Sequence, residues 1–325
     1  MLKLKYLFEN YALAKEALAH WEHDAASLDD MLSQFRISSN AIYPFLHGEK
    51  RCFLRLAPTE EKQENNIIGE LEFIRFLRGH GYAALTPIPA RSGEYYLRLT
   101  TSFGEYYASA FEEVPGVPIE STDYSPEIMY AYGRALAQLH NLSERFTPNT
   151  RKWTHREALD WTAGTLEAYG APDFVFRELN ALKSALEALP IRSDNYGLVH
   201  YDFEPDNVFW EPQAKLCSVI DFDDGIYHWY ALDLEQVFDC LAEELAADAL
   251  QTAKECFLRG YCELRAFSEE AKLSLPLMHR FINLYGYARL RRSVAEQFEN
   301  EPDWLVQLRK KLNASIAGKE SAMRP

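Results

Sequence analysis

Residues 198–224, LVHYDFEPDNVFWEPQAKLCSVIDFDD, set reactive polar side chains between short apolar runs. The runs at 208–210 and 216–220 have the length and apolar character of buried strands. Paired as a hairpin, they would bring three oxygen-bearing side chains to one edge of a small sheet, those of Asp202, Asn207 and Asp221. Carboxylate and amide oxygens are the ligands that hard divalent cations prefer. The segment therefore predicts a divalent-metal site.

The spacing of these residues narrows the chemistry. Phosphoryl transfer uses an Asp that orients and deprotonates the attacking hydroxyl, an Asn five residues later that binds metal, and a further metal-binding Asp after the next strand. Asp202, Asn207 and Asp221 fit that order, which makes Asp202 the candidate catalytic residue and the other two candidate Mg²⁺ ligands. His200 is interpreted as a structural residue that holds the loop by hydrogen bonding.

The motif His200-Tyr201-Asp202 with Asn207, followed by Ile220-Asp221-Phe222-Asp223, resembles the phosphotransferase family that includes aminoglycoside, homoserine and choline kinases. That family usually has His-Gly-Asp, and the related protein kinases have Asp-Phe-Gly, so Tyr201 and Asp223 are departures. Neither departure removes a group that the reaction needs, so they bear on subfamily and substrate. The resemblance implies an α+β, two-lobed protein-kinase-like fold.

An N-terminal nucleotide-binding lobe is predicted for residues 1–114 and a mainly helical catalytic and substrate-binding lobe for 115–325. Apolar alternation predicts a five-stranded antiparallel sheet in the first lobe, with strands at 35–37, 41–46, 51–56, 95–100 and 106–111. Pro44 cannot donate a ladder hydrogen bond, which predicts a sheet edge or bulge there. Residues 3–20 have the spacing of one amphipathic helix.

The turn Ser38-Ser39-Asn40 lies where a kinase-like fold covers the nucleotide phosphates. It contains no glycine, and an ordinary hairpin turn is the alternative interpretation. The resemblance also implies a hinge in which backbone groups near Glu113 and Val114 bind the base.

Arg55 is a cation on a predicted buried strand, which calls for an anionic partner. The resemblance implies that Arg55 holds the α- and β-phosphates and pairs with Glu70 of the next helix, with Glu72 as the second choice. An arginine can grip phosphate with two donors. A surface ion pair of little energetic value is the alternative.

The second lobe contains an apolar stripe over 128–139 that predicts a helix beneath the catalytic loop. His140 at its end is interpreted as structural. Helical patterns over 151–189 break near Gly170-Ala171-Pro172, and the resemblance implies that such helices wall the substrate site. Asp233 matches a family position that holds the catalytic loop in place.

Composition limits the partners. A net charge of −15 over 325 residues repels nucleic acid and anionic membranes. We expect neither a membrane span nor a secretory signal, and hence a cytoplasmic protein. The five cysteines are scattered, which is typical of reduced thiols.

The predicted function is Mg²⁺-dependent transfer of phosphate from ATP or GTP to a hydroxyl of a small molecule. One alternative is a protein Ser/Thr kinase, although the interval from Asp221 to Asp233 is too short for an activation loop. A second is a regulatory protein that binds nucleotide without catalysis. A metal-independent hydrolase is disfavoured because no Ser or Cys nucleophile with a paired His is apparent.

The charge around the motif points to the acceptor. Residues 198–248 contain thirteen acidic side chains against one basic, Lys215, a difference of −12. A cleft of one sign concentrates ligands of the other. The sequence therefore predicts an amine-bearing acceptor such as an amino alcohol, amino sugar or aminoglycoside, with cation–π contacts from Tyr201, Tyr227 and Trp229. A merely solvated acidic surface is the alternative.

Overall fold

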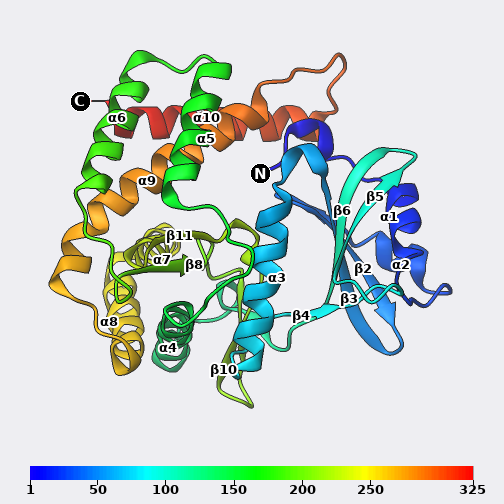
Figure 1. Cartoon of the computed structure of the whole chain (residues 1–325), viewed down its shortest axis with the longest axis horizontal. Coiled ribbons are helices and arrows are strands. Elements are labelled where there is room, and N and C mark those ends of the chain that lie inside the picture. Colours follow the sequence, from blue (N-terminus) through cyan, green and yellow to red (C-terminus); the bar gives the residue numbers. More distant parts are fainter. Residues whose placement is uncertain (325) are drawn as a thin grey trace.

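The computed structural model describes residues 1–324 and shows a sheet-rich part beside a helix-rich part (Figure 1). The sheet is antiparallel, has the strand order β1-β2-β3-β6-β4, and also pairs β5 with β6. Its strands are β1 (Arg36–Ile37), β2 (Ala41–His47), β3 (Lys50–Pro58), β4 (Thr86–Ile88), β5 (Tyr96–Thr101) and β6 (Gly104–Glu112).

The expectation of five strands is wrong by one, because β4 was not predicted. Its centre is Pro87, which lacks an N–H, and a three-residue strand gives no alternation to detect. The strand is tolerated because it ends the sheet and pairs with β6 alone. Pro44 lies opposite Phe53 of β3, while β1 pairs with β2 only through Ala41 and Ile42. At Pro44, the side of β2 that faces away from β3 is therefore an unpaired sheet edge, as expected for a residue without an N–H group.

The N-terminal residues form two short helices, which corrects the expectation of one helix over 3–20. A 3₁₀ turn, η1 (Leu4–Tyr6), precedes α1 (Tyr11–Leu18), and the Asn10 side chain caps α1 by accepting from the Leu13 N–H at 2.9 Å. Side chains before the break pack against the C-terminal helix, in a cluster of Leu2, Leu4, Leu7 and Leu305. Helix α1 and α2 (Leu28–Leu32) instead cover the sheet.

Helix α3 (Glu64–Gly79), preceded by η2 (Thr59–Glu61), lies between the sheet and the helical part (Figure 1). Its Phe73 ring packs on Phe222 and Phe146, with centroids 6.0 and 5.0 Å apart. One continuous core thus runs from α3 into the helical part.

The helical part holds seven helices within the described residues and two small sheets. The helices are α4 (Pro126–Ser143), α5 (His155–Ala168), α6 (Asp173–Glu187), α7 (Ala231–Glu244), α8 (Ala247–Leu264), α9 (Glu269–Val294) and α10 (Asp303–Met323). The strands are β7 (Val117–Pro118), β8 (Tyr196–Val199), β9 (Val208–Glu211), β10 (Leu216–Val219) and β11 (Ile226–Trp229). Short turns are η3 (Ile119–Ser121) and η4 (Phe222–Asp224).

Helices α4 and α8 approach each other backbone to backbone. A Cβ atom on Gly133 would overlap the carbonyl oxygen of Phe257, and one on Gly260 would overlap that of Tyr130. The two glycines therefore allow a close contact that also buries the predicted stripe of α4. Tyr132 of that stripe donates from its hydroxyl to the carbonyl of Phe203, so α4 supports the loop after His200 as predicted.

Within residues 1–324, no helix combines the length and apolar character needed to cross a bilayer. All five cysteines are free thiols, as expected.

Candidate active site

Two antiparallel strand pairs, one of them a hairpin, position the motif. Strands β9 and β10 pair with Val208 opposite Val219, and just beyond this pair the Ile220 N–H donates to the carbonyl of Asn207 at 3.0 Å. This register brings Asn207 beside Asp221, as the hairpin prediction required. Strand β8 pairs separately with β11, so His200 at the end of β8 enters the loop from the other side.

Asn207 is bonded directly to the candidate catalytic residue. Its Nδ2 donates to the backbone oxygen of Asp202 at 3.0 Å and to Oδ2 of Asp202 at 2.9 Å. Because the side-chain nitrogen is used in this way, the side-chain oxygen Oδ1 of Asn207 is the atom left to bind a cation. Burial raises the pKa of Asp202 well above its ordinary value, and the negative charges of Glu204, Asp224 and Asp221 add to that rise.

Asp221, two residues after the end of β10, adopts a left-handed backbone conformation, with φ of 60° and ψ of 55°. Burial, followed by the charge of Asp223, raises the pKa of Asp221 to about 7. Among residues 1–324 its carboxylate finds no cation within salt-bridge distance. The side-chain oxygens of Asp221 and Asn207 thus line one cavity, and neither is in an ion pair within residues 1–324, a donor set that fits a hard divalent cation.

His200 and Asp233 fix the loop that carries Asp202. The ring of His200 bonds the Ile220 carbonyl through Nε2 at 2.9 Å and accepts from the Asp202 N–H through Nδ1 at 3.2 Å. Burial lowers the pKa of His200 to about 4, so the ring is neutral and serves as the predicted structural bridge. Asp233 accepts the backbone N–H groups of His200 and Tyr201, at 2.9 and 2.8 Å.

The Arg55–Glu70 pair predicted from the resemblance is present and buried. Arg55 Nη1 and Nη2 donate to Oε1 and Oε2 of Glu70 at 2.7 and 2.6 Å, and the two residues are 7 % and 1 % exposed. The alternative of a weak surface pair is therefore wrong. The second-choice partner, Glu72, instead accepts the backbone N–H groups of Asn149 and Thr150.

A cavity of about 320 Å³ collects most of the predicted site residues. Those that line it are Ser38, Ser39, Arg55, Glu113, Val114, Asp202, Asn207 and Asp221. The Glu113 N–H is bonded to the Arg51 carbonyl at 3.1 Å and is not available to a ligand. The Val114 N–H has no such bond within the described chain, so it is the free donor at the predicted hinge.

Two predicted site residues lie outside that cavity. Glu70 contacts it only through Arg55. Asn40 lines a smaller neighbouring cavity, and its Nδ2 donates to Oδ2 of Asp223 at 3.0 Å.

Asp223 is a functional-site residue whose partners the sequence did not reveal. Besides Asn40, it binds the ammonium group of Lys62 just ahead of α3. Burial alone would raise the pKa of Asp223, but Lys62 and Arg55 outweigh it and hold that pKa below its usual range. The only indication in the sequence was an aspartate at the position where protein kinases have the glycine of Asp-Phe-Gly. Its partner Lys62 lies about 160 residues away in the chain.

A second cavity, of about 130 Å³, lies next to Asp223 and Asp224 and is walled partly by aromatic side chains. Its lining includes Trp153, Trp161, Tyr285 and Arg289. Arg289 pairs with Asp224 at 2.6 Å, and Ser39 lines both this cavity and the larger one.

The expected cation–π contacts from Tyr201 and Trp229 are wrong. Both residues are 4 % exposed, Tyr201 against Tyr285 and Trp229 against His155. Tyr227 is only partly buried and packs against the main core. The aromatic side chains that line the second cavity are instead Trp153, Trp161 and Tyr285, which come from the segment before α5, from α5 and from α9.

Much of the acidic surplus is neutralised by ion pairs. Arg36 lies 3.5 Å from Asp206, and Lys62 and Arg289 pair with Asp223 and Asp224. Glu204 and Glu243 have no cation within 4.0 Å in residues 1–324. Burial, then Asp206 and Glu243, raises the pKa of Glu204. Glu204 and Asp221 in turn raise the pKa of Asp202, so part of the unpaired negative charge lies beside that residue.

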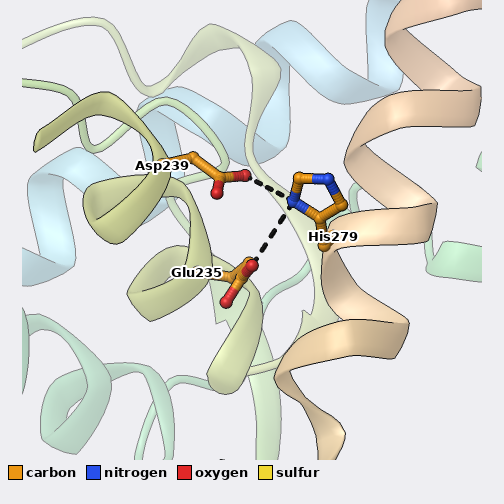
Figure 2. Close-up of side chains that lie close together, drawn as sticks. All are labelled: Glu235, Asp239 and His279. Atoms are coloured by element: carbon orange, nitrogen blue, oxygen red, sulfur yellow. Dashed lines mark hydrogen bonds and ion pairs between the residues drawn. The ribbon is translucent and has the colours of Figure 1, made fainter. Parts of the chain in front are cut away.

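A separate cluster of two carboxylates and an imidazole, Glu235, Asp239 and His279, joins α7 to α9 (Figure 2). His279 Nδ1 lies 2.8 Å from Oδ2 of Asp239 and 3.4 Å from Oε1 of Glu235. The imidazole between the two carboxylates accounts for their close approach. Burial, then Asp239, raises the pKa of Glu235 to about 7.

Comparison with known proteins agrees with this geometry. The phosphotransferase enzyme family (APH) matches residues 33–271. Amicoumacin kinase of Bacillus subtilis (strain 168) is 23% identical over 294 residues, which cover 87% of this chain and 86% of the relative.

Two solved structures have the same fold. An amicoumacin kinase in complex with AMP-PNP, Ca²⁺ and Ami superposes with a TM-score of 0.77 at 20% identity, covering 97% of this chain and 95% of the other. A microcompartment-associated aminopropanol kinase gives a TM-score of 0.69 at 23% identity, covering 96% and 97%. The predicted α+β, protein-kinase-like fold is thereby confirmed.

Proposed function

The chain belongs to the phosphotransferase enzyme family, and from that premise we propose that it transfers phosphate from ATP or GTP, with Mg²⁺, to a hydroxyl group of a small amine-bearing molecule. The observation that carries the proposal is the single cavity that Asp202, Asn207, Asp221 and Arg55 share with the Val114 backbone. A base, metal ligands, a phosphate-binding cation and a free hinge donor are the parts that phosphoryl transfer needs.

Each residue has a defined task in this proposal. Asp202 orients the acceptor hydroxyl and takes its proton as the bond from the acceptor oxygen to the γ-phosphorus forms and the bond to the leaving nucleoside diphosphate breaks. Asn207 and Asp221 hold Mg²⁺, which offsets the charge of the phosphates when it is bound. The Asn207–Asp202 hydrogen bonds keep the base next to the metal ligands.

The nucleotide binds between the two lobes, for which we retain the division at 1–114 and 115–325. Arg55, held by Glu70, faces the phosphates from β3, and Ser38 and Ser39 cover them from the turn between β1 and β2. The carbonyl of Glu113 and the N–H of Val114 bind the base. Free thiols fit the cytoplasm, where cysteines stay reduced.

In this proposal the acceptor binds in the second cavity, which side chains of α5 and α9 partly line, and its hydroxyl points toward Asp202. Trp153, Trp161 and Tyr285 offer aromatic faces to a cation. One solved neighbour is named for aminopropanol, which carries both an amine and a hydroxyl. These observations support an amine-bearing acceptor for this chain.

The path from Asp221 to Asp233 favours a small acceptor over a protein. It consists of η4, β11 and the first turn of α7, all ordered and mostly buried, with no segment of the length of an activation loop. A peptide would also need an open shelf, whereas helices α5 and α9 wall the second cavity.

The test is acceptor-dependent release of ADP or GDP across amino alcohols, amino sugars and aminoglycosides, each matched with a hydroxyl compound that lacks the amine. We expect kcat/KM to favour the amine and the preference to shrink as salt rises. Equal use of neutral acceptors would refute the amine, and absence of Mg²⁺-dependent nucleotide turnover with every acceptor would refute the kinase proposal and favour a nucleotide-binding regulator.

A further inference from the structure

Residues 149–154, here called the strap, cross between α3 and the turn that follows Asp221. On the α3 side, Oε2 of Glu72 accepts the N–H groups of Asn149 and Thr150 at 2.8 and 3.2 Å. Oδ1 of Asn66 accepts the Trp153 N–H at 3.0 Å. The strap is thus bonded to two turns of one helix through its own backbone.

The other side of the strap is bonded to the catalytic part of the chain. The Tyr227 N–H donates to the Trp153 carbonyl at 2.8 Å, and Thr154 forms a bridge with Tyr227 of β11. The strap then enters α5 through a capping box between Thr154 and Glu157. Both of its ends are therefore fixed, which makes it a tie between two elements and not a loose connection.

Lys152 is the centre of this tie. Its side chain is 2 % exposed, and its Nζ donates to the carbonyl oxygens of Phe222 and Asp223 at 3.0 and 2.7 Å. No carboxylate of residues 1–324 lies within 4.0 Å of this ammonium group. Burial lowers the pKa of Lys152. Burial of a charged ammonium group costs free energy, and only its hydrogen bonds offset that cost. Here both hydrogen bonds go to main-chain carbonyls, so the ammonium group holds that stretch of backbone.

Gly69 makes room for the Lys152 stem on α3. A Cβ at this position would lie 2.8 Å from Lys152 Cγ and 2.7 Å from the Thr150 carbonyl oxygen. Gly69 directly precedes Glu70, the partner of Arg55. The stem of Lys152 therefore rests on α3 at the turn that carries Glu70, and its tip rests on the turn that carries Asp221.

We propose that Lys152 is a positioning residue that, through the strap, fixes α3 against the 222–224 turn and so sets the Arg55–Glu70 pair relative to Asp221. The proposal rests on the function above, because the two groups it aligns are the proposed phosphate-binding cation and metal ligand. Nucleotide binding then depends on a residue that touches neither the nucleotide nor the metal.

The test compares Lys152→Met, which keeps the stem and removes the donors, with wild type by amide hydrogen exchange without nucleotide. We expect exchange in α3 (Glu64–Gly79) and at 222–224 to rise about tenfold while the sheet and α8 stay unchanged. The Kd for Mg²⁺·AMP-PNP and the KM for nucleotide should rise by a similar factor, with a much smaller change in kcat.

Lys183→Met is the matched control, because Lys183 makes only a surface pair with Asp160 and should change neither readout. Glu72→Ala removes one of the two anchors of the strap on α3, at a partly exposed site, and should raise exchange in α3 even if Lys152→Met does not fold. Unchanged α3 exchange, or a uniform rise throughout the protein, would overturn the proposal. Hydrogen exchange is measured without nucleotide, so it tests the role of Lys152 independently of the proposed function. A wild type that binds no nucleotide would refute only the proposed function.

Discussion

The backbone N–H of Tyr201 donates to Oδ1 of Asp233 at 2.8 Å, and the neighbouring N–H of His200 donates to Oδ2 at 2.9 Å. Tyr201 has a φ of 64°, a conformation that costs a non-glycine residue about 1–2 kcal/mol. Related phosphotransferases usually have glycine there, so this chain keeps the backbone shape with a side chain present. Asp233 and the packing of Tyr201 against Phe281 and Tyr285 offset the strain.

Asp233→Asn should destabilise the protein and slow turnover together. The amide keeps only one accepting oxygen, so one of two buried N–H groups loses its partner, at a cost of about 1–3 kcal/mol. His140, whose Nε2 lies 3.0 Å from Oδ2 of Asp233, would also lose an anionic neighbour. Urea unfolding checks the stability. A variant as stable as wild type would contradict the role given to Asp233.

Asp202→Asn should leave the affinity for Mg²⁺·nucleotide nearly unchanged and lower kcat by a factor on the order of 10²–10⁴. The change removes the acceptor of the hydroxyl proton and keeps a side chain of the same shape beside Asn207. Calorimetry and steady-state kinetics measure the two quantities separately. Full activity would rule out Asp202 as the base.

Asp221→Ala should abolish Mg²⁺-dependent nucleotide binding. Without this carboxylate the phosphates lose the cation that offsets their charge beside Asp202 and Asp223. Titrating nucleotide with and without Mg²⁺ distinguishes this effect from misfolding, because binding in the absence of the metal should remain weak in both proteins. Affinity equal to wild type in Mg²⁺ would disprove the assignment.

Arg55→Ala should weaken nucleotide binding and cost about 3–5 kcal/mol of stability, because Glu70 would remain as an unpaired buried charge. Arg55→Lys should be intermediate. A lysine keeps the positive charge, but the two parallel hydrogen bonds to Glu70 need the guanidinium fork. Equal Kd and unfolding free energy for the lysine variant and wild type would contradict this.

Glu235→Gln should stabilise the protein increasingly as pH rises. The folded-state pKa of Glu235 is about 7, above its ordinary value, since burial and Asp239 outweigh His279. The wild type therefore loses stability as pH rises from about 4.5 through 7, by about 1–2 kcal/mol once solvent screening of this partly exposed group is allowed for. Glutamine does not ionise. Thermal unfolding at pH 5 and pH 8 should show a larger gain at pH 8, and a gain independent of pH would exclude this effect.

The parts of the site that lie close together in sequence could be predicted. Asp202, Asn207 and Asp221 are joined by one hairpin, so strand pairing alone brings them together. Arg55 and Glu70 needed only a strand and the next helix. The Lys62–Asp223 and Lys152–Phe222 contacts join segments 70 to 161 residues apart, and no local pattern encodes such pairs.

The predicted secondary structure was wrong where one residue or one tertiary pairing determined the local structure. The side chain of Asn10 caps the start of α1 inside the apolar pattern of residues 3–20, and apolar spacing alone does not reveal such a capping bond. The strand at Thr86–Ile88 owes its existence to pairing with β6, which tertiary structure supplies and the sequence of three residues does not.

Gly133 and Gly260 have a consequence for how this protein can diversify. Any single-base change that alters either glycine adds at least one carbon atom where a neighbouring carbonyl already lies. Libraries selected for a new acceptor should therefore return variants around Trp161 and Tyr285 but retain both glycines, whatever compound is used for selection. The α4–α8 contact separates the positions at which the chain can explore new chemistry from two at which it has no freedom to vary.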